Sequence, residues 1–172
     1  MAGEAQIETL VTYLEMTRPP SGAPLSAPAG IEVRRAARPT IGFYRYLYDA
    51  IGTEWMWYER KLLDDAQVAA IIHDPGVEVN VLWVDGVPAG LAELDSREPP
   101  NVELAYFGLL PGFIGRGLGR FLLDWAVHHV WRSHPRRFWV HTCDLDHPRA
   151  LGVYQKAGFR IYDRRTALAT PP

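Results

Sequence analysis

The sequence has 172 residues, of which 48% are hydrophobic and 22% charged, so one domain with a substantial core fits it and two ordinary domains do not. Its net charge of −2 argues against a nucleic-acid partner held by bulk electrostatic attraction. Cys143 is the single cysteine, which excludes an intramolecular disulfide and fits a reducing compartment. No apolar run approaches the roughly 20 residues of a membrane span, and residues 1–14 lack a leader pattern. We therefore expect a cytoplasmic protein without a membrane partner.

The first 30 residues predict an N-terminal extension in two parts. Residues 7–16 mix Thr, Val, Tyr and Leu, which favours a strand, although the spacing of the apolar residues also suits a short helix. We expect the strand. Residues 17–30 carry four prolines among Ala, Ser and Gly, a composition that predicts a surface linker. Residues 31–172 are then expected to form a single domain.

The chain from residue 31 to residue 76 predicts a strand followed by two helices. Residues 31–35 alternate apolar and charged side chains, as a strand does, and the spacing over 40–51 predicts a helix with Gly52 as its C-cap. Asp64 opens a capping box for a second helix, which ends before Pro75. Between these helices, residues 54–60 contain three large aromatic side chains, which either fill a core or form one wall of a substrate cleft.

A hairpin and a third strand follow. Residues 77–84 and 87–94 predict two strands that turn at Asp85-Gly86, and 102–110 predict the next strand. Glu93, on the returning hairpin strand, is a carboxylate that can face a cleft. Regular alternation along the third strand predicts one face with Glu103, Ala105, Phe107 and Leu109, and another with Leu104, Tyr106, Gly108 and Leu110.

Residues 111–120 place three glycines at every second position, between this strand and a helix expected over 117–132. A strand, a glycine turn and a helix N-terminus gather free amide groups and the positive end of a helix dipole at one point. Such a point binds anions, above all phosphates. The alternative is that Gly115 and Gly117 merely allow a tight turn.

The last third of the chain predicts a strand, a helix and a strand. We expect a strand over residues 137–143. Because the helix over 117–132 connects it to the strand over 102–110, the two strands should be parallel neighbours. Asp146 or His147 can cap a helix that starts at Pro148 and ends at Gly158. Residues 160–167 supply the last strand.

The glycine stretch and this last third together resemble the GNAT N-acetyltransferase superfamily, whose members transfer an acetyl group from acetyl-CoA to an amine. The family's phosphate signature is Arg or Gln, two residues, Gly, one residue, then Gly or Ala, and residues 114–119 read Ile-Gly-Arg-Gly-Leu-Gly. Its second signature is Asn, two residues, Ala, three residues, Tyr, then a Gly-Phe pair, which residues 147–154 and 158–159 match. Ile114 replaces the Arg or Gln, and His147 replaces the Asn.

The resemblance implies an α+β fold with a central mixed sheet of six to seven strands, flanked by about four helices. The strands ending near Leu110 and starting near Arg137 splay apart in this family, and the gap takes the pantetheine arm of acetyl-CoA. The implied cofactor-binding residues are Leu109, Leu110, Gly115, Arg116, Gly117, Leu118, Gly119, Arg120, His147 and Ala150. The family also allows a homodimer.

The resemblance also implies direct attack by the amine through a tetrahedral intermediate. An alkylammonium must first lose a proton, for which Glu103 falls at the family's general-base position and His141 is an alternative or relayed base. Tyr154 matches the general acid that protonates the departing thiolate. The residues expected to line the acceptor cleft are Trp57, Tyr58, Tyr106 and His141.

Two alternatives to catalysis with acetyl-CoA follow from the same residues. The departures at Ile114 and His147 also suit a non-catalytic acyl-CoA-binding module, and the glycine turn alone also suits a protein that binds another nucleotide. No metal is expected, because the adjacent His128 and His129 point about 100° apart on a helix and no His-Glu-x-x-His pattern exists. The acceptor is a small molecule or a protein lysine or N-terminus.

Overall fold

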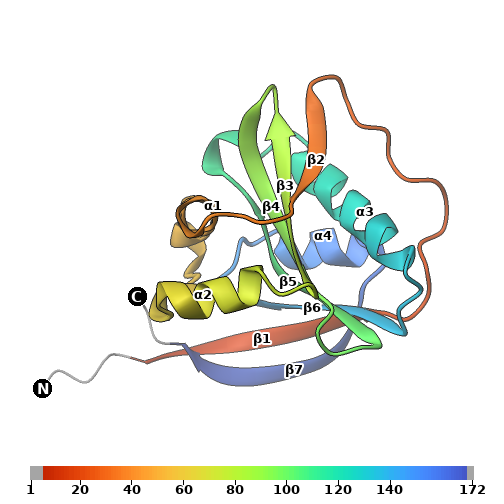
Figure 1. The fold of residues 1–172 in the computed structure, drawn as a ribbon. Helices are drawn as coiled ribbons and strands as arrows, with labels where there is room; N and C mark the ends of the chain where they lie inside the picture. Colours follow the sequence, from red (N-terminus) through yellow and green to blue (C-terminus); the bar gives the residue numbers. More distant parts are fainter. Residues whose placement is uncertain (1–5, 170–172) are drawn as a thin grey trace, which may run out of the picture.

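A computed structural model describes residues 6–169, and a seven-stranded sheet runs through its centre (Figure 1). The strands are β1 (Ile7–Met16), β2 (Ile31–Ala36), β3 (Val77–Val84), β4 (Val87–Asp95), β5 (Asn101–Leu109), β6 (Arg137–Cys143) and β7 (Arg160–Ala169). The helices are α1 (Ile41–Gly52), α2 (Asp65–Ile72), α3 (Leu118–Trp131) and α4 (Ala150–Ala157), with short 3₁₀ turns η1 (Thr53–Trp55), η2 (Glu59–Leu62) and η3 (Pro111–Phe113). No described helix is long and apolar enough to cross a membrane.

The strand order is β2-β3-β4-β5-β6-β1-β7, and the sheet is mixed. Neighbouring strands are antiparallel except β5 and β6, which run parallel because α3 carries the chain back between them. The α+β architecture that the resemblance implied is therefore confirmed, with strands and helices where the sequence patterns predicted them.

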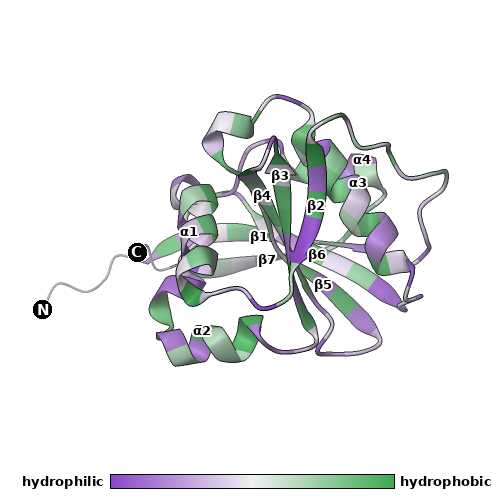
Figure 2. Ribbon diagram, turned by 45° about the horizontal axis from the view of Figure 1, so that its top comes forward, coloured by the Kyte–Doolittle hydropathy of each residue, from purple (hydrophilic) through white to green (hydrophobic). Residues whose placement is uncertain are grey.

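Two apolar cores lie on the two faces of the sheet. Side chains of α3 and α4 pack on one face, and those of α1 and α2 pack on the other, over β3 and β4. The second half of strand β3, residues 81–84, is continuously hydrophobic because both faces of the sheet are covered there (Figure 2). Burial of both faces fixes the central strands, on which the site described below depends.

The N-terminal segment forms strand β1, as expected, and the helical alternative is excluded. This strand lies inside the sheet, where Val11 pairs with Cys143 of β6 on one side and with Arg165 of β7 on the other. Residues 17–30 then pass along α3, where the Leu25 amide donates to Asp124 Oδ2 at 2.8 Å. β1 is thus the link that joins β7 to the rest of the sheet.

The caps of two helices differ from the prediction. Gly52 is the last residue of α1 and its φ is −93°, so the C-cap is Thr53 and no left-handed residue ends the helix. Gly52 is needed for another reason: a Cβ atom there would lie 2.4 Å from Cβ of Trp57, which packs against it.

Helix α4 begins at Ala150, two residues later than expected, with Arg149 at the N-cap position and no side-chain cap. The Asp146 carboxylate turns back instead, and its Oδ2 accepts from Thr142 Oγ1 at 2.6 Å and from the Cys143 amide at 2.8 Å. The His147 ring accepts the Arg149 amide through Nδ1 at 3.0 Å. Both side chains therefore hold the loop before α4.

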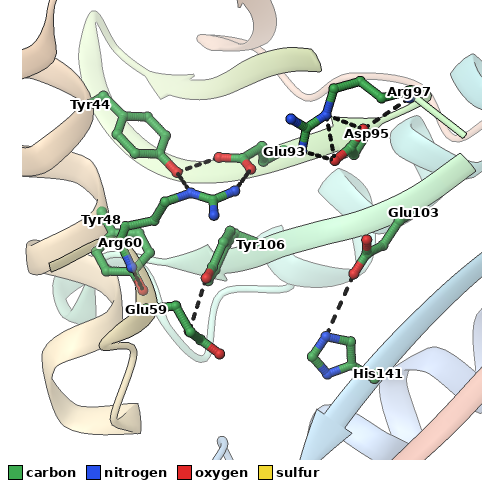
Figure 3. Close-up of polar contacts among 10 residues, drawn as sticks. All are labelled: Tyr44, Tyr48, Glu59, Arg60, Glu93, Asp95, Arg97, Glu103, Tyr106 and His141. Carbon is green, nitrogen blue, oxygen red and sulfur yellow. Dashed lines mark hydrogen bonds and ion pairs between the residues drawn. The ribbon is translucent and has the colours of Figure 1, made fainter. Parts of the chain in front are cut away.

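The regular alternation predicted for β5 is wrong, because the strand contains a bulge. Glu93 pairs with Tyr106 but its neighbour Leu94 pairs with Leu104, which leaves Ala105 as the extra residue. Beyond the bulge Phe107 joins Leu104 on the α3 face, and Tyr106 lies on the α1 face. Glu103 and Tyr106 consequently project to the same side of the sheet (Figure 3).

The predicted splay between β5 and β6 is present. The two strands pair only from Asn101 and Arg137 to Glu103 and Trp139, although β5 continues to Leu109 and β6 to Cys143. Their remaining halves diverge, and the gap leaves room for a cavity.

Candidate functional site

A cavity of about 460 Å³ opens where β5 and β6 part. Its walls come from the two diverging strands, the glycine turn before α3, the start of α4 and the aromatic segment 55–59. Thr9 and Val11 of β1 and the last residues of β7 complete the lining. The chain segments that carried the sequence motifs therefore meet around one hollow.

One end of this cavity is suited to an anion. Gly115 and Gly117 adopt positive φ values of 85° and 76°, a conformation that side chains with a Cβ rarely adopt. Gly117 is the N-cap of the 14-residue helix α3, and no side chain caps the helix. The first-turn amides and the positive end of the dipole are thus available to a ligand, and Arg120 and Arg149 line the cavity nearby.

Most of the residues predicted to bind the cofactor line this cavity, namely Leu109, Gly115, Gly117, Gly119, Arg120, His147 and Ala150. Three others do not. Leu110 donates its amide to Ala89 O at 2.9 Å, Leu118 is buried in the core, and the Arg116 guanidinium lies over the Phe113 ring, 5.5 Å from its centroid.

All four residues predicted for the acceptor cleft line the cavity: Trp57, Tyr58, Tyr106 and His141. The ring of Trp57 lies 5.0 Å from that of Tyr106 and 5.4 Å from that of Tyr48, so the indole is packed on the α1 core. Trp55 lies 4.9 Å from the His147 ring and joins the aromatic segment to the loop before α4. The aromatic rings of the segment 54–60 therefore pack on a core and also line the cavity, and their role as a wall for substrate stays a prediction.

Glu93 does not face the cleft, contrary to expectation. Its side chain is fully buried beneath α1, where one carboxylate oxygen accepts from the Tyr44 hydroxyl and the other from Arg60 Nη2 at 2.9 Å. Burial raises the pKa of the Glu93 carboxyl, and Arg60 opposes that rise. Glu93 pairs with Tyr106 of β5, the residue that directly follows the bulge.

Arg60 connects this buried group to the cavity. Its guanidinium lies over the Tyr106 ring, 5.0 Å from the centroid, and the Tyr106 hydroxyl donates to Glu59 Oε2 at 2.9 Å (Figure 3). Burial, and after it the charge of Glu59, raises the pKa of the Tyr106 phenol, which therefore keeps its proton and remains a donor. Glu59 itself lines the cavity.

Glu103 and His141 form a pair at the splay. His141 Nε2 lies 3.6 Å from Glu103 Oε1, with the histidine side chain 41% exposed and the glutamate 25%. Only His141 lines the cavity. The Glu103 carboxylate beside it raises the pKa of His141, whose ordinary value is near 6.5.

Tyr154 projects from α4 into the same cavity and is 6% exposed. Its ring packs 6.0 Å from those of Phe107 and Phe159, and its hydroxyl has no hydrogen-bond partner among residues 6–169. Burial, and then the charge of Asp146, raises the pKa of the phenol, so it is protonated at neutral pH. Asp146 also lines the cavity, and burial raises the pKa of its carboxyl.

The sequence patterns did not predict two of the carboxylates that line this cavity, Glu59 and Asp146. Glu59 stands in a segment notable for its aromatic residues, and Asp146 precedes a helix, where an acidic residue normally reads as a cap. Neither belongs to a motif, so only the fold brings them to the cavity. Within residues 6–169 no group of three or more His, Cys, Asp or Glu side chains is placed to hold a metal ion.

The model of the acetyltransferase (GNAT) family matches residues 33–159 of this chain. The chain belongs to the GNAT family. This family uses acetyl-CoA as its co-substrate, and the uncapped helix N-terminus with its two left-handed glycines fits the diphosphate of that molecule. The roles of the individual residues stay predictions.

Several curated proteins are similar to this GNAT chain. A mycothiol acetyltransferase of Corynebacterium glutamicum (strain R) is 30% identical over 84 residues, which are 49% of this chain and 28% of that protein. An uncharacterised N-acetyltransferase of Mycobacterium tuberculosis (strain ATCC 25618 / H37Rv) is 30% identical over 112 residues, 60% of this chain and 66% of that protein. The matches thus span less than two thirds of the length of these relatives.

Solved structures with the same fold include a GCN5-related N-acetyltransferase from Sphaerobacter thermophilus, with a TM-score of 0.66 and 19% identity, over 98% of this chain and 62% of that one. A Bacillus subtilis acetyltransferase in complex with CoA has a TM-score of 0.60 and 18% identity, over 77% of this chain and 78% of that one. At these identities the likeness is one of fold.

Proposed function

We propose that this GNAT protein is an acetyl-CoA-dependent N-acetyltransferase that acts on a primary amine, with His141 as the base and Tyr154 as the acid. One observation carries the proposal: a single cavity is lined by an uncapped helix N-terminus, by Tyr154, whose hydroxyl has no partner among residues 6–169, and by His141, which pairs with Glu103. Two relatives named mycothiol acetyltransferase support a small-molecule acceptor.

In the proposed reaction, neutral His141 takes a proton from the acceptor ammonium through Nδ1, because its Nε2 faces Glu103, and this frees the lone pair of the acceptor nitrogen. A C–N bond then forms at the acetyl carbonyl, and the C–S bond breaks as the thiolate leaves. The Tyr154 hydroxyl donates its proton to that sulfur, and the second proton that the newly acylated nitrogen gives up restores the phenol. Glu103 is a positioning residue, because it contacts His141 and not the cavity, and its charge stabilises the imidazolium.

The proposal assigns the family's base position to a pair instead of to Glu103 alone. His141 is the member that a substrate can touch, and Glu103 keeps its proton affinity high. The cytoplasmic location, the homodimer and the division of the chain at residue 30 remain predictions.

Release of free CoA thiol from acetyl-CoA in the presence of a panel of amines tests the function. We expect Tyr154→Phe to lower kcat by about 10²- to 10⁴-fold, the usual contribution of a general acid. Its Kd for CoA, measured by calorimetry, should stay within about twofold, because the ring keeps its packing against Phe107 and Phe159.

The matched control is Tyr46→Phe, a change at an exposed tyrosine of α1 outside the cavity, which should leave kcat unaltered. CoA binding without thiol release for any amine would instead support a non-catalytic acyl-CoA-binding module. A Tyr154→Phe protein with full kcat would remove Tyr154 from the role of acid.

A further inference from the structure

The cavity is lined by two carboxylates that have no salt-bridge partner among residues 6–169. Glu59 and Asp146 both line the hollow. Glu59 accepts from the Tyr106 hydroxyl, and Asp146 accepts from Thr142 and the Cys143 amide, all of which are uncharged donors. Neither carboxylate forms a salt bridge with a residue in the described range 6–169.

The nearest guanidinium does not supply the missing charge. Arg60 makes its salt bridge with the fully buried Glu93 at 2.9 Å and presents its flat face to the Tyr106 ring. That pair is neutral as a unit, since one positive and one negative charge meet beneath α1. Glu59 therefore has no salt bridge with Arg60, and its charge acts instead on His141, which lines the same cavity.

The same end of the cavity offers surfaces that favour a cation. Trp57, Tyr58 and Tyr106 line it, and aromatic faces attract ammonium and guanidinium groups within about 6 Å. An independent feature marks the hollow as a ligand site: the Tyr154 side chain is 94% buried, lines it, and leaves its hydroxyl without a partner among the described residues.

The attacking nitrogen cannot be the cation that balances Glu59. A nitrogen must give up its proton before it attacks a thioester, and in the proposed reaction that proton goes to His141. After this transfer the attacking group is neutral. An acceptor cation that stays charged throughout is therefore a separate group from the attacking nitrogen.

We propose that the acceptor is an amine with a second, non-reacting cationic group, and that Glu59 binds this group. The inference rests on the proposed function, because it takes His141 and Tyr154 to mark the reacting end. Asp146 and Glu59 both line the cavity, Asp146 in the loop before α4 and Glu59 at the end of the aromatic segment 55–59. The acceptor class is therefore a diamine or an amine with a guanidinium group.

The buried groups beneath α1 position Glu59 for this task. Glu93 fixes Arg60, Arg60 lies against the Tyr106 ring, and the Tyr106 hydroxyl holds one Glu59 oxygen. The other Glu59 oxygen accepts no hydrogen bond from a described residue and is available to a cation. Tyr106 is therefore a positioning residue for binding.

The test compares acceptors that differ only in the second group: 1,4-diaminobutane, butylamine and 4-aminobutanoate. We expect kcat/KM for the diamine to exceed that for butylamine by about tenfold, the effect of about 1.4 kcal/mol from one ion pair with aromatic contacts. The aminobutanoate should be the poorest acceptor, because its carboxylate meets Glu59. In Glu59→Gln the diamine preference should fall to about one.

Glu54→Gln is the matched control, since Glu54 belongs to the same segment but does not line the cavity, and it should keep the wild-type preference. A further variant, Tyr106→Phe, should raise KM for the diamine by a larger factor than KM for butylamine. Equal kcat/KM for diamine and monoamine in the wild type, or a preference that survives in Glu59→Gln, would overturn the inference while the proposed function stands.

Calorimetry with 1,4-diaminobutane decides the inference even if no amine is acetylated. Binding to the wild type and to Glu54→Gln, with about tenfold weaker binding to Glu59→Gln, supports a cation site at Glu59 in a protein without turnover. Equal binding to all three proteins, or no binding to the wild type, overturns it.

Discussion

The Glu103–His141 pair shows how a side chain outside the cavity governs one that lines it. In the proposed reaction neutral His141 is the active form of the base, so kcat/KM should rise with pH through the pKa of His141, which the charged Glu103 carboxylate raises above its ordinary value. In Glu103→Gln that charge is lost and the pKa of His141 falls. The rising limb of the profile should then move to lower pH, with a lower plateau because the base is weaker.

The measurement is kcat/KM from pH 5 to pH 9 with one amine for the wild type and Glu103→Gln. Glu98→Gln, a change in the turn before β5, serves as the control and should leave the limb in place. If the rising limb stays at the same pH in Glu103→Gln, ionisation of His141 does not control kcat/KM. Glu103 itself would then be the candidate base.

Single residues were predictable from the sequence where a motif or an aromatic cluster marked them. Tyr154 and the glycines 115 and 117 stand in ordered signatures, and the aromatic segment is visible as composition. The bulge at Ala105 is invisible, because a single extra residue leaves the apolar pattern of β5 plausible in either phase. Glu59 and Asp146 are likewise recognisable only once distant segments meet.

At the scale of elements, periodicity located the strands and helices, whereas caps depended on tertiary contacts. The end of α1 illustrates the difference: a glycine there predicted a left-handed cap, yet the residue is right-handed and is needed because Trp57 packs on its Cα. Helix α4 also starts late because Asp146 is engaged with Thr142 and not with the helix. Local sequence cannot reveal which competing partner a side chain takes.

Gly52→Ala tests this close approach. The new Cβ would lie 2.4 Å from both Cβ and Cγ of Trp57, and Cβ cannot turn away, so the indole must shift. We expect a loss of about 1–3 kcal/mol in the free energy of unfolding, typical of overpacking, and a changed tryptophan emission spectrum.

Gly42→Ala is the control within the same helix, since a Cβ there meets nothing within 4 Å. Alanine suits a helix better than glycine by about 0.5–1 kcal/mol, so this variant should be as stable as the wild type or more so. Urea titration measures both variants. A Gly52→Ala protein of wild-type stability would mean that Trp57 can repack without cost, and that the wall of the cavity is not held at this point.

For the whole molecule, the sequence motifs do not indicate how much of the sheet depends on the N-terminal strand β1. The match to the family model covers residues 33–159 and leaves out β1 and the whole of β7. In the sheet, however, β1 is hydrogen-bonded to β6 and β7 on its two sides, and β7 has no other strand neighbour among residues 6–169. Leu14 and Met16 of β1 also belong to the core under α3 and α4.

Removal of residues 1–30 therefore tests how much of the fold the remaining chain can form alone. We expect residues 31–172 to lose cooperative thermal unfolding, because β7 is left without a partner, β6 becomes an open edge, and the buried side chains of Leu14 and Met16 are lost. Truncating one buried Leu costs about 2–5 kcal/mol, and a whole domain is stable by only about 5–15 kcal/mol.

Because the lost strand pairs through its backbone on both sides, a separate peptide can replace it. A synthetic peptide of residues 1–30, added to the truncated chain, should restore a cooperative melt by circular dichroism, and a peptide with Leu14→Asp should not, since that position is fully buried. If residues 31–172 melt cooperatively at the wild-type temperature, β1 contributes little to the sheet. The cavity would then have to be closed by β6 and β7 without the Thr9 and Val11 side chains that now line it.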